Sequence, residues 1–99
     1  MARIRIASLS EIPPGDMIEY RDGDDRFLVC NVDGALHAMD GTCPHRGGPF
    51  SQGALHGPMV VCPWHAWEFD CRTGACDFNA TALETYPVEV VNGAVVVDA

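Results

Sequence analysis

The segments Cys43-Pro44-His45 and Cys62-Pro63-Trp64-His65 decide how the rest of this chain is interpreted, and residues 46–61 separate them. Each segment offers one thiolate and one imidazole. Ligands of these two kinds, when they converge from two loops, form sites for soft and borderline transition metals. The sequence therefore predicts a metal centre held by Cys43, His45, Cys62 and His65.

The spacing within the two segments differs, with C-x-H in the first and C-x2-H in the second. This pattern resembles the Rieske iron-sulfur proteins, in which two cysteines hold one iron of a 2Fe-2S cluster and two histidines hold the other. The flanking sequence is also similar. Residues 45–53, HRGGPFSQG, resemble the first loop of that family, and residues 67–74, WEFDCRTG, resemble the strand and turn after its second loop. The resemblance covers nearly the whole chain and implies one Rieske-type 2Fe-2S cluster on these four residues.

A structural zinc module is the alternative that the ligand types leave open, because two thiolates and two imidazoles can bind zinc tetrahedrally. Zinc modules usually place two cysteines on one tight turn. Here each segment pairs a cysteine with a histidine. The spacing therefore favours the iron-sulfur interpretation.

The remaining cysteines and histidines have simpler interpretations. Cys30 lies within an apolar strand pattern and is expected to be a buried thiol. Cys71 and Cys76 flank a turn, so a disulfide between them is conceivable, but a reducing compartment favours free thiols. His37 and His56 have no partner at ligand spacing, and we do not expect them to bind metal.

Length and composition indicate one soluble domain, residues 1–99, with a cluster-binding lobe at about residues 41–70. Hydrophobic residues make up 47% of the chain and charged residues 20%, as in ordinary globular proteins. No apolar run is long enough to span a membrane, and Met1-Ala2-Arg3 leads directly into an alternating pattern. We therefore expect neither an anchor nor a signal peptide, and a cytoplasmic location.

Short alternating or apolar segments bounded by turn residues are typical of an antiparallel β protein. Strands are expected at residues 2–7, 17–20, 26–32, 35–40, 59–61, 67–70, 85–91 and 94–97, with a charged loop at 21–25. Asp33-Gly34 and Asn92-Gly93 are strong two-residue hairpin signals. The predicted fold class is all-β, a small antiparallel sandwich or barrel from which the two-loop cluster-binding lobe projects.

The net charge of -8 is unevenly distributed along the chain. Within residues 43–76, Arg46 and Arg72 balance Glu68 and Asp70, so the acidic excess lies outside the predicted lobe. An acidic body repels nucleic acid and is attracted to basic protein surfaces. A near-neutral lobe suits the small, short-lived contacts of an electron-transfer protein, which we expect to be a monomer.

The resemblance also indicates a branch of the family. High-potential Rieske proteins carry a disulfide between the loops and Ser and Tyr hydroxyls near the cluster. The matching positions here are Gly48, Trp64, Trp67 and Phe69. The chain in this respect resembles the soluble, low-potential Rieske ferredoxins that serve ring-hydroxylating oxygenases.

The function implied by this resemblance is electron transfer without a substrate of its own. The chain would carry single electrons from a flavin-dependent reductase to a terminal mono- or dioxygenase. It is too short to include the mononuclear iron domain of the oxygenase itself. The alternative is the small Rieske-like subunit of an assimilatory nitrite reductase, in which catalysis would reside in a partner.

Overall fold

The computed structural model of the protein describes residues 3–22, 25–41, 53–61, 68–76 and 82–98. This part of the chain forms β-strands and one short 3-10 helix, η1. The elements in chain order are β1 (Arg3–Ser8), η1 (Leu9–Glu11), β2 (Met17–Asp22), β3 (Asp25–Val32), β4 (Ala35–Asp40), β5 (Ala54–His56), β6 (Met59–Val61), β7 (Glu68–Asp70), β8 (Thr85–Tyr86), β9 (Val88–Val91) and β10 (Ala94–Asp98). The all-β prediction is confirmed.

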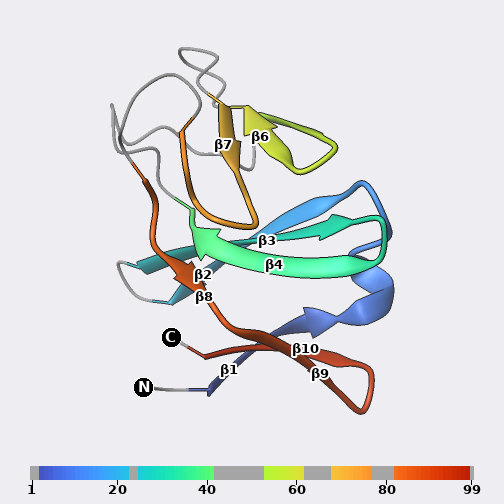
Figure 1. Ribbon diagram of the computed structural model, residues 1–99. Coiled ribbons are helices and arrows are strands. Elements are labelled where there is room, and N and C mark those ends of the chain that lie inside the picture. The colour runs from blue at the N-terminus through green and yellow to red at the C-terminus, as the bar shows by residue number, and fades with distance from the viewer. Residues whose placement is uncertain (1–2, 23–24, 42–52, 62–67, 77–81, 99) are drawn as a thin grey trace.

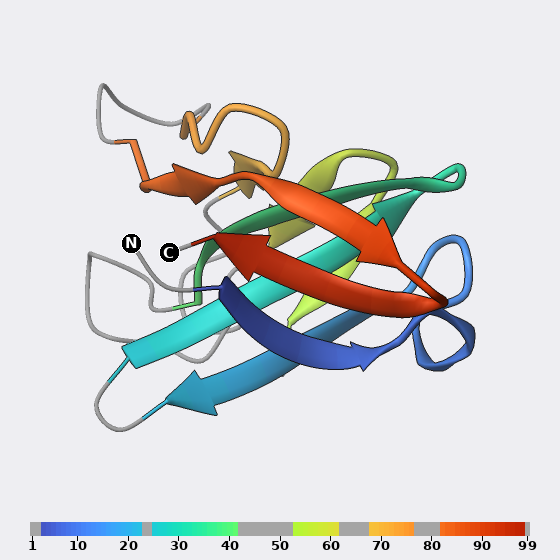
Figure 2. The ribbon, with the colours of Figure 1, turned by 90° about the horizontal axis from the view of Figure 1, so that it is seen from below.

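The strands form three antiparallel sheets that lie in layers (Figure 1). The lower sheet has the order β1-β10-β9, the middle sheet β2-β3-β4-β8, and the upper sheet β5-β6-β7. Viewed from below, β1, β9 and β10 cross over the longer strands of the middle sheet (Figure 2). The upper sheet is the described part of the predicted lobe, and we refer to it as the lobe sheet.

The middle sheet is buried on both faces, and strand β3 shows this most clearly. Val29 packs into the core shared with the lower sheet, whereas Leu28 and Cys30 pack into the core shared with the lobe sheet. All three side chains are fully buried. Successive residues of a strand point to opposite faces, so a sheet covered on both sides has strands with continuous apolar runs. This explains the run Phe27 to Cys30.

Two apolar cores result from this layering. The lower core lies between the lower and middle sheets and contains Ile6, Ala7, Ile12, Val29, Ala38, Val95 and Val97. The upper core lies between the middle sheet and the lobe and contains Leu28, Cys30, Met39, Val60, Phe69, Cys71, Cys76 and Leu83. Each large side chain that is fully buried stabilises the fold by about 1.5 to 3 kcal/mol. The lobe is therefore anchored to the body by burial of its own apolar face.

Both predicted hairpin turns are confirmed. Asp33 and Gly34 have positive φ angles of 52° and 96°, and Asn92 and Gly93 have φ angles of 49° and 78°. Two consecutive residues with positive φ form the turn whose twist matches that of the flanking strands. The buried Asn31 side chain supports the first turn, since it accepts a hydrogen bond from the Gly34 amide and donates one to the Ile12 carbonyl.

Three details of the strand prediction were wrong. The expected loop at residues 21–25 is shorter, because β2 continues to Asp22 and pairs with β3 from Asp25. The Glu19 carboxylate lies within 4 Å of guanidinium nitrogens of both Arg21 and Arg26, which favours the longer ladder over a charged loop. The strand expected at residues 85–91 is two strands separated by Pro87, which has no amide hydrogen to donate. Strand β5 was not predicted.

No helix within the described ranges is long and apolar enough to cross a membrane.

Candidate metal centre

The four predicted ligands lie in the two segments that connect β4 to β5 and β6 to β7. Cys43 and His45 lie in residues 42–52, and Cys62 and His65 lie in residues 62–67, so all four are outside the described residues. Gly48, Trp64 and Trp67 are outside them as well. The structure does describe the residues that directly flank both segments.

Three residues in register across the lobe sheet bring the two loops to the same edge. Ala54 at the start of β5 pairs with Val61 at the end of β6, and Val61 pairs with Glu68 at the start of β7. Val61 immediately precedes Cys62, and Glu68 follows His65 by three positions. The return of the first loop and both ends of the second are therefore neighbours on one sheet edge, above the middle sheet in Figure 1.

The fourth end, where the first loop leaves the body, is fixed by backbone hydrogen bonds. The amide of Asp40 donates to the Glu84 carbonyl at 2.9 Å, and the amide of Gly41 donates to the Arg26 carbonyl at 2.9 Å. Gly41 is buried, and a Cβ atom added to it would lie 3.2 Å from the Cβ atom of Arg26. A glycine here lets the chain pass close to β3 before the first ligand segment.

The turn after β7 is held by backbone hydrogen bonds to its own residues and to the turn between β5 and β6. The carbonyl of Asp70 accepts hydrogen bonds from the amides of Thr73 and Gly74, and the Asp70 amide donates to the Ala75 carbonyl. The Cys71 amide donates to the Pro58 carbonyl in the turn between β5 and β6. The turn that the resemblance of residues 67–74 implies is confirmed, and its hydrogen bonds connect it to the turn between β5 and β6.

The Asp70 carboxylate fixes this turn through Arg72. It accepts hydrogen bonds from Nε of Arg72 at 3.0 Å, from its Nη2 at 2.7 Å and from its backbone amide at 2.9 Å. These bonds hold the pKa of Asp70 below its usual value, and the positive charge of Arg72 acts in the same direction. The spacing Asp-x-Arg was visible in the sequence, but its role was not predicted.

Replacing Asp70 by asparagine should lower the stability of the protein at pH 7. A carboxyl whose pKa is lowered by folding stabilises the folded state above its unfolded pKa of about 3.8, and this contribution is lost as the pH falls through the lower folded value. The urea midpoint of Asp70→Asn should therefore lie below that of the wild type at pH 7, and the difference should shrink below pH 3.8. Glu89→Gln, which affects an exposed pair with Arg3, is the control expected to change little. A difference that persists unchanged at low pH would contradict this role.

The predictions for the three other cysteines are confirmed. Cys30, Cys71 and Cys76 are buried and none forms a disulfide, so the conceivable Cys71–Cys76 bridge is absent. The expectation of free thiols at Cys71 and Cys76 holds, and both side chains belong to the upper core. Phe69 also belongs to this core and is fully buried.

The two remaining histidines lie in different sheets. His37 is on β4 and His56 ends β5. Among the residues that the structure describes, no three His, Cys, Asp or Glu side chains gather closely enough to hold a metal ion. This leaves the two ligand segments, outside those residues, as the candidate metal centre.

The chemistry of this donor set fits a 2Fe-2S cluster. Two thiolates neutralise the net positive charge of two ferric ions and two sulfides, and the two imidazoles add none. The register of Ala54, Val61 and Glu68 places the return of the first segment beside both ends of the second. Cys43, His45, Cys62 and His65 are the residues that would hold the cluster.

Comparison with known proteins gives a consistent result. Residues 2–87 match the family model "Rieske [2Fe-2S] domain". The ferredoxin component of a biphenyl 2,3-dioxygenase from Rhodococcus jostii is 35% identical over 99% of this chain and 94% of its own length. The solved structure of Sphingomonas yanoikuyae B1 ferredoxin is 28% identical, has a TM-score of 0.89, and covers 99% of both chains.

Two further structures have the same fold in different settings. A chain in a complex of reduced oxygenase and oxidised ferredoxin from carbazole 1,9a-dioxygenase is 28% identical, with a TM-score of 0.89 over 96% of this chain and 91% of its own. A Mycobacterium tuberculosis chain assigned as the small subunit of an NADH-dependent nitrite reductase has a TM-score of 0.85 over 97% of this chain and 93% of its own, but at 22% identity it supports the fold alone. The family match and the full-length relatives agree with the resemblance of the two ligand segments, and the chain belongs to the Rieske [2Fe-2S] domain family.

Proposed function

We propose that this Rieske protein passes single electrons from a flavin-dependent reductase to a terminal ring-hydroxylating oxygenase. The observation that carries the proposal is its full-length similarity to a ferredoxin component of a dioxygenase system, with 94% of that relative covered. Such a component is a carrier and not a catalytic oxygenase. The bound cluster supplies the redox chemistry, and the residues of the chain hold it and position it for docking.

The charge distribution supports brief encounters with two different partners. The exposed acidic side chains of the body include Glu11, Asp16, Asp33, Glu84 and Glu89. Opposite charges on a partner accelerate association without the large apolar interface of a permanent complex. A monomer that exchanges partners fits this pattern. The three buried thiols outside the ligand segments fit a reducing, cytoplasmic compartment.

Reconstitution with purified partners tests the proposal. The protein is mixed with a flavin reductase and a ring-hydroxylating oxygenase from the same organism, and turnover of an aromatic substrate is measured as the protein is titrated. We expect turnover to depend on the protein and to fall as ionic strength rises, because salt screens the acidic body. Turnover that is the same without the protein would contradict a carrier role. Stable co-purification with a sirohaem subunit would favour the nitrite reductase alternative.

We expect a midpoint potential near the low end of the Rieske range, about -150 mV. Hydroxyl groups that donate hydrogen bonds to the cluster favour its reduced state, and the positions where high-potential members have hydroxyls are Trp67 and Phe69 here. Protein-film voltammetry at pH 7 measures the potential. A value well above zero would show that the low-potential assignment is wrong.

A further inference from the structure

Residues 82–86 connect the lobe to the middle sheet, and we call this stretch the strap. At its first residue, Ala82 forms an isolated β-bridge with Ala75 in the chain that follows β7. Its last two residues, Thr85 and Tyr86, are strand β8 and pair with β4. Figure 1 shows this part of the chain descending from the lobe to the tip of β4. The strap is therefore bonded to both parts of the fold.

The lobe end of the strap is held closely against the turn after β7. The Leu83 amide donates a hydrogen bond to the Gly74 carbonyl at 2.7 Å, and the Gly74 amide donates to the carbonyl of Asp70, the last residue of β7. A Cβ atom added to Gly74 would overlap the Leu83 carbonyl oxygen, so the two backbones are in contact. The Leu83 side chain is buried in the upper core. Backbone contact and core packing together fix the strap relative to β7.

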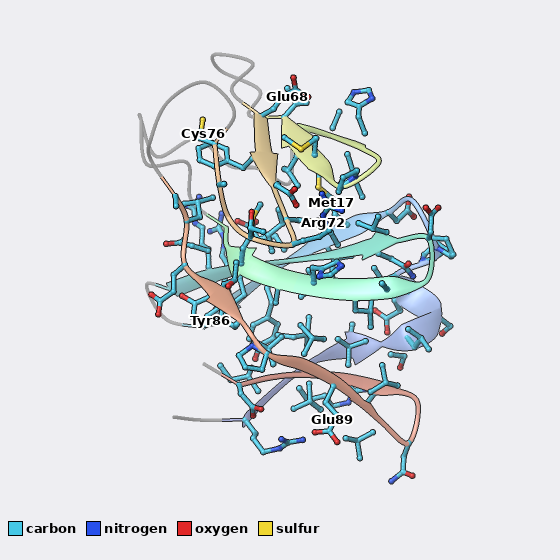
Figure 3. All side chains as sticks on the ribbon, in the orientation of Figure 1. Met17, Glu68, Arg72, Cys76, Tyr86 and Glu89 are labelled. Atoms are coloured by element: carbon cyan, nitrogen blue, oxygen red, sulfur yellow. The ribbon has the colours of Figure 1, made fainter. Side chains whose placement is uncertain are left out.

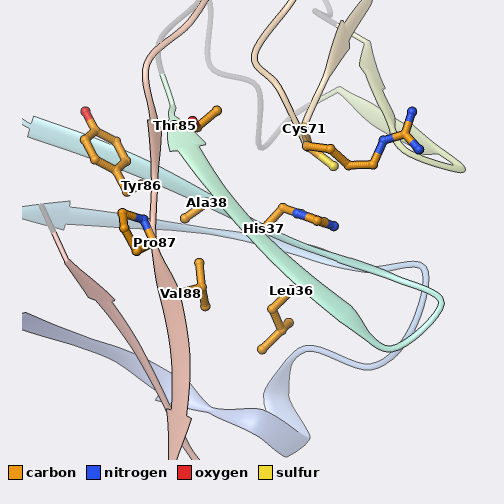
Figure 4. A pocket seen from close by; sticks show the side chains of 9 residues that line it. Leu36, His37, Ala38, Cys71, Thr85, Tyr86, Pro87 and Val88 are labelled. Carbon is orange, nitrogen blue, oxygen red and sulfur yellow. The ribbon is translucent and has the colours of Figure 1, made fainter.

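The other end of the strap is bonded to the residue from which the chain leaves β4 toward the first ligand segment. The Asp40 amide donates a hydrogen bond to the Glu84 carbonyl at 2.9 Å, and Ala38 pairs with Tyr86. Figure 4 shows the strap running alongside β4 at Tyr86 and Ala38. Asp40 is the last residue of β4, and Cys43 follows it by three positions. The strap thus holds the start of the first ligand segment.

The predicted cluster joins the same two parts of the chain as the strap. Each ligand segment contains one of the two cysteines and one of the two histidines. Since one iron is held by both cysteines and the other by both histidines, each iron takes one ligand from each segment. The first segment starts from β4 and the second ends at β7, the two strands that the strap connects. The distance between the segments therefore enters the coordination geometry of both irons.

We propose that the strap is a positioning element for the cluster, and that the contact between Gly74 and Leu83 sets the distance between the two ligand segments. Groups that orient the ligands of a metal tune its redox potential, even when they act through other residues. Gly74 and Leu83 act through the backbone that joins them to β7 and β4. The inference rests on the ligands predicted from the sequence. It goes beyond the proposed function, because it concerns the cluster itself and no electron partner.

Electron paramagnetic resonance of the dithionite-reduced holoprotein tests this proposal, because the g values of the cluster depend on the ligand geometry of its irons. Gly74→Ala forces the strap away from the turn, so its g values and midpoint potential should differ from those of the wild type. Gly93→Ala is the matched control, since its φ angle is 78° against 79° and, apart from its chain neighbours, no residue has an atom within 4 Å of an added Cβ. Its g values and potential should be those of the wild type. A spectrum and potential of Gly74→Ala identical to those of the wild type would overturn the proposal.

A second pair of variants decides the question if Gly74→Ala does not fold or holds no cluster. Leu83→Ala removes the buried side chain of the strap, and Val97→Ala shortens a fully buried side chain of the lower core. Both should lower the urea midpoint, but only Leu83→Ala should alter the g values, because the strap then loses its support in the upper core. Unchanged g values in Leu83→Ala, or equal changes in both variants, would show that the strap acts on stability alone. The readouts need neither reductase nor oxygenase, so they do not depend on the proposed function.

Discussion

Cys62→Ala should yield a colourless protein with almost no iron or acid-labile sulfide, whereas the wild type should be red-brown with two irons per chain. Cys62 is one of the two predicted thiolate ligands, and it directly follows Val61 at the edge of the lobe sheet. Removing one ligand leaves a cluster iron without a full set of donors. Iron and sulfide assays with the visible absorption spectrum measure the result. Cys43→Ala, His45→Ala and His65→Ala should have the same effect.

The matched controls are the cysteines of the upper core. Cys30→Ser, Cys71→Ser and Cys76→Ser remove a sulfur atom but should keep the cluster, since these side chains are buried in the described core. Loss of iron from any of the three would mean that the ligands are misassigned. A colourless wild type that binds one zinc would support the structural zinc module instead.

Gly74→Ala should destabilise the protein by about 3 to 5 kcal/mol, a large part of the stability of a small domain. Gly74 has a φ angle of 79°, and a Cβ atom added to it would overlap the carbonyl oxygen of Leu83. That carbonyl belongs to the backbone, so it cannot move aside as a flexible side chain could. Gly74 and Leu83 are also joined by a hydrogen bond from the Leu83 amide to the Gly74 carbonyl at 2.7 Å. The urea midpoint measured by circular dichroism gives the change.

Gly93 provides a control with the same backbone conformation. Its φ angle is 78°, but apart from its chain neighbours no residue has an atom within 4 Å of an added Cβ. Gly93→Ala should therefore cost only the strain of the left-handed conformation, about 1 to 2 kcal/mol. Equal losses of stability in the two variants would show that the contact with Leu83 has no effect.

The fold class was predictable because its strongest signals are local. Asp33-Gly34 and Asn92-Gly93 define two hairpins through backbone conformations that few other residue pairs adopt. Strand β5 was missed because Ala54-Leu55-His56 is too short to show a period, and only its pairing with β6 identifies it. The three-layer arrangement was missed for a related reason, since an apolar run shows that a strand is buried but not what covers each face.

The candidate site was also predictable only in part. The four ligands were found from residue types and spacing, and their side chains lie outside the described residues, so this assignment stays a prediction. The frame around them was not predicted. The shared membership of Cys30 and Cys71 in the upper core depends on how the lobe packs on the body, and the register of Ala54, Val61 and Glu68 depends on strand pairing. Neither is encoded in a short stretch of sequence.

The packing of β3 has a consequence for how the protein unfolds. Side chains of β3 contribute to both cores, and Figure 3 shows side chains on both sides of the middle sheet. Neither core can be disrupted without exposing one face of the same strand. Body and lobe should therefore melt in one cooperative transition, so that release of iron and loss of strand signal occur together. In cells, a substitution in the lower sheet that weakens folding would reduce the supply of electrons without touching the redox centre.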